Sequence, residues 1–207
     1  AQALEGMEQV EAAVTHYRHF LTQNSQSILA GSARQRLAAL HLESDNHQAA
    51  IELYEELMEE PALAPRSIYF IALAHLEAGQ KDVAYRQYVQ LMEEYPKDKR
   101  ALSAAIDIEG PLNAKAAFAV ASTYHAHKRY ADSKKRFQQF IKRFPHDQRV
   151  ADAYYNLALS QLGLGQYETA IRTFEKTYEQ YGLPSALYRI GGVYITRNNE
   201  ADAIAIY

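Results

Sequence analysis

The chain has 207 residues, 48% of them hydrophobic, which is enough apolar surface for a substantial core. Its formal net charge of −3 and pI near 6.3 argue against nucleic-acid binding through overall positive charge. The absence of cysteine excludes disulfides, thiol catalysis and cysteine-based zinc sites. No apolar run reaches the ~18–20 residues that a membrane span requires.

A short pattern recurs along the chain: a small residue is followed four positions later by an aromatic residue. In chain order the pairs are Ala13/Tyr17, Ala50/Tyr54, Ala84/Tyr88, Ser133/Phe137, Ala170/Phe174 and Ala203/Tyr207. The small residues are separated by 37, 34, 49, 37 and 33 residues. A period of ~34 residues is typical of a repeated helical hairpin, so the pattern predicts a solenoid.

Each pair is expected on the second helix of a hairpin. In residues 167–178 the apolar residues lie at helical spacing and form one stripe. Residues 114–127 and 151–163 carry similar stripes and are expected to be the preceding first helices. The expected turns between partners are Gly79-Gln80, Lys128-Arg129 and Gly165-Gln166, and Pro96 and Pro145 are expected to end second helices.

These residues resemble the tetratricopeptide repeat (TPR) family. In the clearest copy, the residues on the family's signature positions are Tyr154, Leu157, Ala158, Gly165, Tyr167, Ala170 and Phe174. Another copy matches with Val120, Ala121, Tyr124, Tyr130, Phe137 and Pro145. It departs from the family at Ser133, where alanine is usual, and the chain has no tryptophan. The resemblance covers nearly the whole chain. It implies an all-α, right-handed superhelical solenoid of about five to six antiparallel helix pairs, with protein binding as its common property.

The 49-residue interval marks an interruption of the repeat. Residues 97–108 (KDKRALSAAIDI) resemble the start of a first helix, as in residues 146–157 (HDQRVADAYYNL). Gly110-Pro111 then stops the helix, and a new helix is expected to begin near Leu112. We interpret residues 97–113 as a short inserted helix between repeats two and three of a single solenoid over residues 1–207. It is either a kink or joint, or a neutral surface insertion.

Residues suited to catalysis or metal binding lack the arrangement that such sites need. His16 and His19 are spaced to share a helix face, but no third ligand is near them in sequence. Acidic pairs such as Glu55-Glu56 are expected on outward helix faces, without a cleft that would make them catalytic. Gly191-Gly192 lies within an expected helix and is interpreted as permitting close packing. We predict no enzyme activity, no metal site and no cofactor.

Residues 128–143 carry seven bases against one acid, Asp132. The basic patch is defined as Lys134, Lys135, Arg136, Lys142 and Arg143. It is either an ordinary solvated helix face or a site for an acidic protein, an anionic polymer or a lipid surface. Nucleic acid is disfavoured because the aromatic residues that would stack on bases are already assigned to packing.

In the TPR family, positions two, five, nine and twelve of each first helix line the concave face, and the resemblance transfers these positions to this chain. Position five is aromatic in successive copies: Tyr69, Phe118, Tyr155 and Tyr188. Rigid rings along a groove suit a peptide, a helix or a sugar; the alternative is packing against neighbouring helices. If these rings bind a partner, we expect Tyr155→Ala and Phe118→Ala to weaken partner binding with little loss of stability.

Three functions remain open from the sequence. The first is an interaction scaffold that binds a protein or peptide along its concave face. The second is the non-catalytic helical arm of a larger bacterial cell-envelope protein. EEYPKDKRA and KRFPHDQRVADAYYNLA resemble repeats of outer-membrane assembly lipoproteins and of lytic transglycosylases. The third is a subunit of a eukaryotic assembly. The chain starts and ends inside a repeat, so we expect a longer protein, with the periplasm or cell envelope favoured over the cytoplasm.

Overall fold

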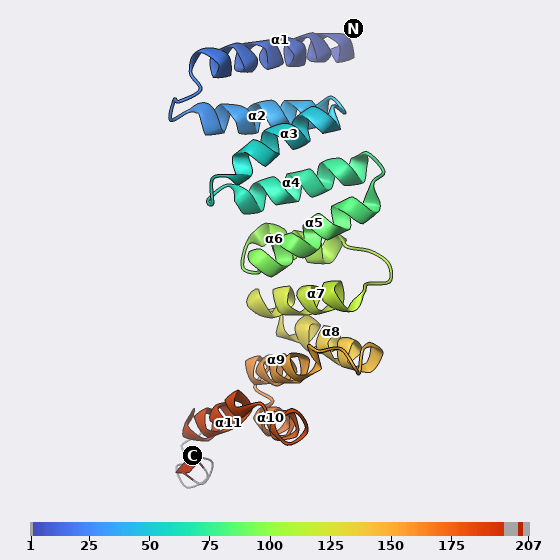
Figure 1. The fold of residues 1–207 in the computed structure, drawn as a ribbon, viewed down its shortest axis with the longest axis vertical. Coiled ribbons are helices and arrows are strands. Elements are labelled where there is room, and N and C mark those ends of the chain that lie inside the picture. Colours follow the sequence, from blue (N-terminus) through green and yellow to red (C-terminus); the bar gives the residue numbers. More distant parts are fainter. Residues whose placement is uncertain (1, 197–202, 205–207) are drawn as a thin grey trace. The chain divides into compact units, whose positions relative to one another are not determined.

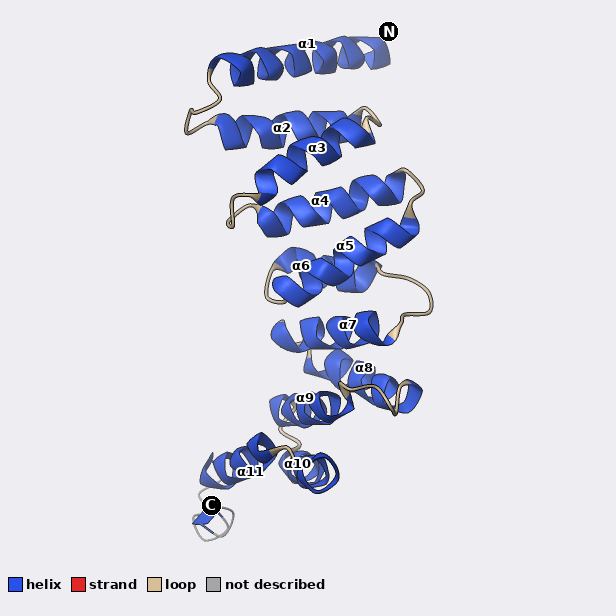
Figure 2. Ribbon diagram, viewed as in Figure 1, coloured by secondary structure: helices blue, strands red, loops and turns tan. Residues whose placement is uncertain are grey.

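The computed structural model describes residues 2–196 and 203–204, with side chains described from Gln9 onward. The described part contains eleven numbered α-helices, and Figure 2 shows helices joined by loops throughout it. The predicted all-α class of repeated helix pairs is therefore confirmed. The chain divides into two compact units, Ala1–Ala104 and Ala105–Tyr207. Whether residues 1–207 form one continuous solenoid stays a prediction.

The first unit is a series of helices that pack in chain order. It contains α1 (Gln2–Gln23), α2 (Ala30–Glu43), α3 (His47–Met58), α4 (Ala64–Glu77), α5 (Lys81–Glu94) and the start of α6 (Lys99–Asp107). Each of α1 to α4 packs against the helix that follows it, as the blue and green ribbons of Figure 1 show. Contacts between sequence neighbours are typical of helical repeats.

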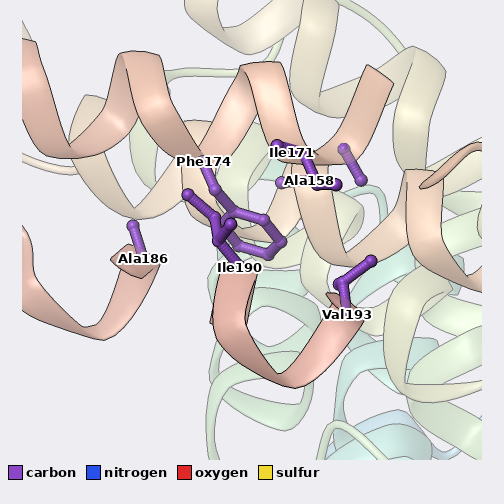
Figure 3. Close-up of a cluster of buried hydrophobic side chains, with 7 residues drawn as sticks. Ala158, Ile171, Phe174, Ala186, Ile190 and Val193 are labelled. Atoms are coloured by element: carbon purple, nitrogen blue, oxygen red, sulfur yellow. The ribbon is translucent and has the colours of Figure 1, made fainter. Parts of the chain in front are cut away.

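The second unit repeats this arrangement. It contains the end of α6, then α7 (Ala114–Ala126), α8 (Tyr130–Arg143), α9 (Val150–Gly163), α10 (Tyr167–Tyr181) and α11 (Pro184–Thr196). Successive helices from α7 to α11 pack together, and α7 also contacts α9. Figure 3 shows the core where α9, α10 and α11 meet, with Phe174 beside Ile190 and Ile171 beside Ala158.

The recurring small and aromatic residues form the seam between the helices. On α3, α5, α8 and α10 the small residues are fully buried and the rings are at most 1% exposed: Ala50, Tyr54, Ala84, Tyr88, Ser133, Phe137, Ala170 and Phe174. A small residue lets the neighbouring backbone approach, and the ring fills the adjoining groove at the density of a protein interior. Of the last pair, Ala203 is buried, whereas Tyr207 lies outside the described residues. The assignment of these aromatic residues to packing is confirmed for the four central pairs.

The turns inside the hairpins α2–α3, α4–α5, α7–α8 and α9–α10 have the same backbone geometry. The left-handed residue of each turn is Asp45, Gly79, Lys128 or Gly165, with φ of 55°, 78°, 58° and 71° respectively. The backbone N–H of the residue after it donates a hydrogen bond to the carbonyl five residues earlier, as from Gln166 to Gln161 at 2.9 Å. This hydrogen bond defines the Schellman motif. Glycine adopts the left-handed conformation without steric cost, so Asp45 and Lys128 hold their turns at a cost in free energy.

Replacing Lys128 tests this cost. Lys128→Gly is expected to raise the free energy of unfolding by about 1 kcal/mol, because glycine removes the clash of Cβ at positive φ. Lys135→Gly, at an exposed position inside α8, is the matched control and should lower it by about 1 kcal/mol. Urea unfolding followed by circular dichroism measures both, and a Lys128→Gly chain less stable than the wild type contradicts the interpretation.

Two helical glycines differ in what surrounds them. A Cβ at Gly163, the last residue of α9, would lie 2.5 Å from Cγ and Cδ2 of the Tyr130 ring. Gly163 therefore permits close contact between the start of α8 and the end of α9. At Gly192 on α11, apart from its chain neighbours and the nearby backbone of its own helix, no atom of the described residues lies within 4 Å of the Cβ position. Close packing, the interpretation made from sequence, does not account for Gly192.

The same substitution at both glycines should have opposite effects. Gly163→Ala is expected to lower the free energy of unfolding by about 1–3 kcal/mol, because the ring of Tyr130 must move. Gly192→Ala should raise it by about 0.5–1 kcal/mol, because alanine favours the helix and meets no neighbour. Urea titration of the two variants in parallel measures the difference, and changes of equal sign contradict it.

Helix α6 lies in the segment where the sequence repeat is interrupted. The Asp98 carboxylate accepts a hydrogen bond from the Arg100 backbone N–H at 2.8 Å, and Asp147 accepts one from Arg149 at 2.9 Å. Both aspartates also bind the guanidinium of the same arginine. The segments that resemble each other in sequence thus start their helices with the same turn. Helix α6 begins like the first helix of a hairpin, but no second helix follows it: the next helix after the loop at residues 108–113 is α7. A kink at residues 97–113 stays a prediction.

Candidate interaction site

Three of the four position-five aromatic rings pack against the second helix of their own hairpin. The ring centroids are 5.9 Å apart in Tyr69–Tyr88, 5.6 Å in Phe118–Phe137 and 5.4 Å in Tyr155–Phe174. Each of the three first-helix rings is half-buried. Their truncation would remove core contacts, so the expectation that Phe118→Ala and Tyr155→Ala leave stability intact is revised. Tyr69 lies in the first unit and the other three lie in the second, and a continuous row of all four stays a prediction.

Tyr188 is 69% exposed, and the residue in its hairpin that corresponds to Tyr88, Phe137 and Phe174, Tyr207, lies outside the described residues. Tyr188 borders a hollow of about 310 Å³ in the second unit, which is lined by Leu162, Tyr167, Tyr188, Arg189, Gly192, Val193 and Thr196. The Arg189 Nε donates a hydrogen bond to the Tyr155 hydroxyl at 2.9 Å, which holds the guanidinium between α9 and α11. The missing side chain at Gly192 leaves this hollow open. An exposed ring, a fixed cation and an apolar recess therefore lie together.

The basic patch on α8 is not uniform. Lys134 Nζ donates to Gln166 Oε1 at 2.9 Å and so contacts the following hairpin. The guanidinium of Arg136 lies 5.9 Å from the Tyr124 ring centroid, and that of Arg143 lies 5.1 Å from the Phe144 centroid. Lys135 and Lys142 are exposed. The arginines are thus oriented by aromatic rings, while the anionic partner of the patch stays a prediction.

A buried polar cluster surrounds Ser133. The Ser133 hydroxyl donates to the Ala121 carbonyl at 3.0 Å and lies 3.0 Å from the Ser160 hydroxyl. Ser160 donates to the Asn156 carbonyl at 2.8 Å, and His125 Nδ1 lies 3.1 Å from Ser160 Oγ. Because each hydroxyl has one proton and Ser160 donates its own to Asn156, a neutral His125 with its proton on Nδ1 can donate to Ser160 Oγ. Sequence reasoning singled out Ser133 but missed the cluster, because its members come from three helices.

Two histidines of the described chain are held in the neutral form. Burial lowers the pKa of His125 below its usual 6.5. Burial, and then the positive charge of Arg18, lower the pKa of His41. The unfolded chain therefore binds more protons than the folded chain once the pH approaches 6.5. The stability that the neutral histidines contribute is present above this pH and is lost as the pH falls.

Thermal unfolding between pH 7.5 and 5 tests this linkage. The melting temperature is expected to fall with pH, and His125→Gln should flatten the slope because residue 125 then takes up no proton. His146→Gln, at an exposed position, is the matched control and should keep the wild-type slope. Asp147 titrates in a different window, since hydrogen bonds from Arg149 lower its pKa to about 2 and its contribution is lost only in stronger acid. A slope that His125→Gln leaves unchanged contradicts the assignment.

Among the side chains described, those of residues 9–196 and 203–204, no three of His, Cys, Asp or Glu are grouped so as to hold a metal ion. None of the helices described is both long and apolar enough to cross a membrane.

Comparisons with known proteins identify the repeat. Two family models, each described as a tetratricopeptide repeat, match the chain: one over residues 121–181 and 155–207, the other over residues 67–98. Together these matches cover more than half of the chain. No curated protein matches it.

Several solved structures with similar folds are structures of MamA. MamA of MSR-1 is 13% identical, with 86% of this chain and 92% of that chain covered and a TM-score of 0.43. MamA from Desulfovibrio magneticus RS-1 is 15% identical, with 85% and 90% covered and a TM-score of 0.40. MamA of AMB-1 is 17% identical, with 84% and 92% covered and a TM-score of 0.41. Similarity at this level carries no conclusion about function.

Proposed function

Because the chain belongs to the tetratricopeptide repeat family, we propose that it is an interaction scaffold that binds a protein or peptide through the concave-face positions of its first helices. The fold is typical of non-catalytic scaffolds, since a stack of helical hairpins offers extended surfaces rather than an enclosed reaction site. The observation that carries the proposal is Tyr188, an aromatic ring 69% exposed at the edge of an open hollow.

The surroundings of Tyr188 favour a peptide. A tyrosine ring offers a large apolar face at small entropic cost, and tyrosine and arginine are enriched among residues that dominate binding energies. Arg189 is already oriented by the Tyr155 hydroxyl, so a partner need not fix its position. The hollow of about 310 Å³ lies at the lower end of the ~300–1,000 Å³ range of ligand sites. Gly192 leaves room for a side chain at a cost of about 0.5–1 kcal/mol in helix stability.

The test is to select binders from a phage-displayed peptide library and then to measure their affinities for two tyrosine variants. Tyr188→Ala is expected to weaken the selected peptides at least tenfold, because the exposed ring is lost from the site. Tyr178→Ala, whose ring on α10 is 41% exposed, is the matched control and should change affinity less than twofold. Calorimetry gives both values, and melting curves check that the variants remain folded.

These affinities show whether the selected peptides bind at Tyr188 or at another surface of the chain. Peptides that bind both variants as tightly as the wild type would place the interaction away from Tyr188. A selection that enriches no peptide would count against a peptide-binding groove.

The proposal for a larger assembly rests on sequence alone. A role as the arm of a bacterial envelope protein predicts a signal peptide or lipidated cysteine upstream, or a hydrolase-like domain downstream, in the full-length gene. A gene that encodes further repeats and neither feature favours the free scaffold. Residence in the periplasm or cell envelope, proposed on the same resemblance, is tested by fractionating cells that express the full-length protein.

A further inference from the structure

Two successive hairpins of the second unit differ at position four of the first helix. In the later hairpin this residue is Tyr154, whose ring lies 5.7 Å from the ring of Tyr181. Lys176 Nζ lies 4.6 Å from the Tyr154 ring centroid and donates to its hydroxyl at 3.0 Å. The space between the two helices is thus filled by a tyrosine that α10 covers.

In the earlier hairpin, 37 residues before, the corresponding residue is Ala117. A hollow of about 100 Å³ remains there, lined by Gly110, Leu112, Ala117, Arg136, Gln139, Phe140, Arg143 and Phe144. The ring of Phe144, the sequence counterpart of Tyr181, packs on the ring of Phe140 at a centroid distance of 5.5 Å, and the two rings border the hollow. All these residues belong to the second unit. We name this site the Ala117 hollow.

The two arginines beside the Ala117 hollow differ from several others in the chain. Arg129 and Arg149 each bind a carboxylate at 2.7 Å. Among the described residues, no carboxylate lies within ion-pairing distance of Arg136 or Arg143. The acid on α8, Asp132, is bonded to Arg129. Stacking on Tyr124 and Phe144 orients the two guanidinium groups while leaving their hydrogen-bond donors for a ligand.

We propose that the Ala117 hollow binds an extended acidic peptide, with one leucine-sized side chain in the hollow and two carboxylates on Arg136 and Arg143. The volume suits one branched aliphatic side chain and is too small for most whole ligands. The arginines are seven residues apart on one helix, about 10.5 Å along its axis. In the polyproline II conformation, which has three residues per turn and rises about 3.1 Å per residue, carboxylates three residues apart lie on one face of the extended peptide about 9 Å apart, so the predicted motif is Asp-Leu-x-Asp. This surface lies on a different part of the repeat from Tyr188.

The probe is the peptide Gly-Ser-Asp-Leu-Gly-Asp-Ser-Gly, titrated into the whole chain by isothermal calorimetry. Ala117→Tyr should weaken binding at least tenfold, because the added ring occupies the hollow, and a melting curve checks that this variant remains folded. Arg136→Gln combined with Arg143→Gln should also weaken binding at least tenfold. Lys135→Gln combined with Lys142→Gln removes the same charge from the same helix and should cost less than threefold. Tyr188→Ala should leave this peptide's affinity unchanged, which separates this site from the proposed groove.

Two control peptides decide between a specific site and simple charge attraction. Replacing the leucine by glycine, or moving the aspartates next to each other, should each weaken binding at least fivefold. Equal affinity for all three peptides, or equal loss in the arginine and lysine variants, would overturn the proposal. So would an Ala117→Tyr chain that binds as well as the wild type, or a wild-type chain that binds none of the peptides.

Discussion

The whole structure depends on one contact: a buried aromatic ring beside a small residue, repeated from hairpin to hairpin. Phe174 beside Ala170 and Phe137 beside Ser133 show the arrangement, with no ring surface left to solvent. The small residue sets how closely two helices approach, and the ring fills the groove that remains. Because each hairpin packs mainly on its neighbours, this local contact has to recur for the stack to hold.

The same contact limits where function can lie. The buried rings of the seam are unavailable to ligands. Most position-five rings pack against them, as Tyr155 packs against Phe174. A residue half-buried in this way supports the fold and borders the surface at once. Mutating such a residue is therefore expected to change both the free energy of unfolding and the affinity for a partner. Mutating the exposed Tyr188 is expected to change mainly the affinity.

Much of this fold was predictable because it follows from periodic residues. The seam pairs, the hairpin turns and the helix ends before Pro96 and Pro145 all follow from local chemistry repeated along the chain. The Ser133 cluster was not predictable, because it joins residues of separate helices whose approach the sequence does not state. The role of Gly192 was misjudged for the same reason. The sequence shows that residue 192 is a glycine, but not whether another helix packs against that position.

Positions that depart from the repeat carry the most information about function. A residue that fits the pattern is explained by packing, which every hairpin needs. Ala117 does not fit: its counterpart Tyr154 fills a space that Ala117 leaves open beside two cations. An unfilled space at a helix junction forfeits packing energy, and the two cations have aromatic partners but no carboxylate partner among the described residues. Ser133 departs as well, yet its hydroxyl is satisfied inside the core and needs no outside partner. The distinction is physical: Ser133 completes its own interactions, while the surroundings of Ala117 are completed by a ligand.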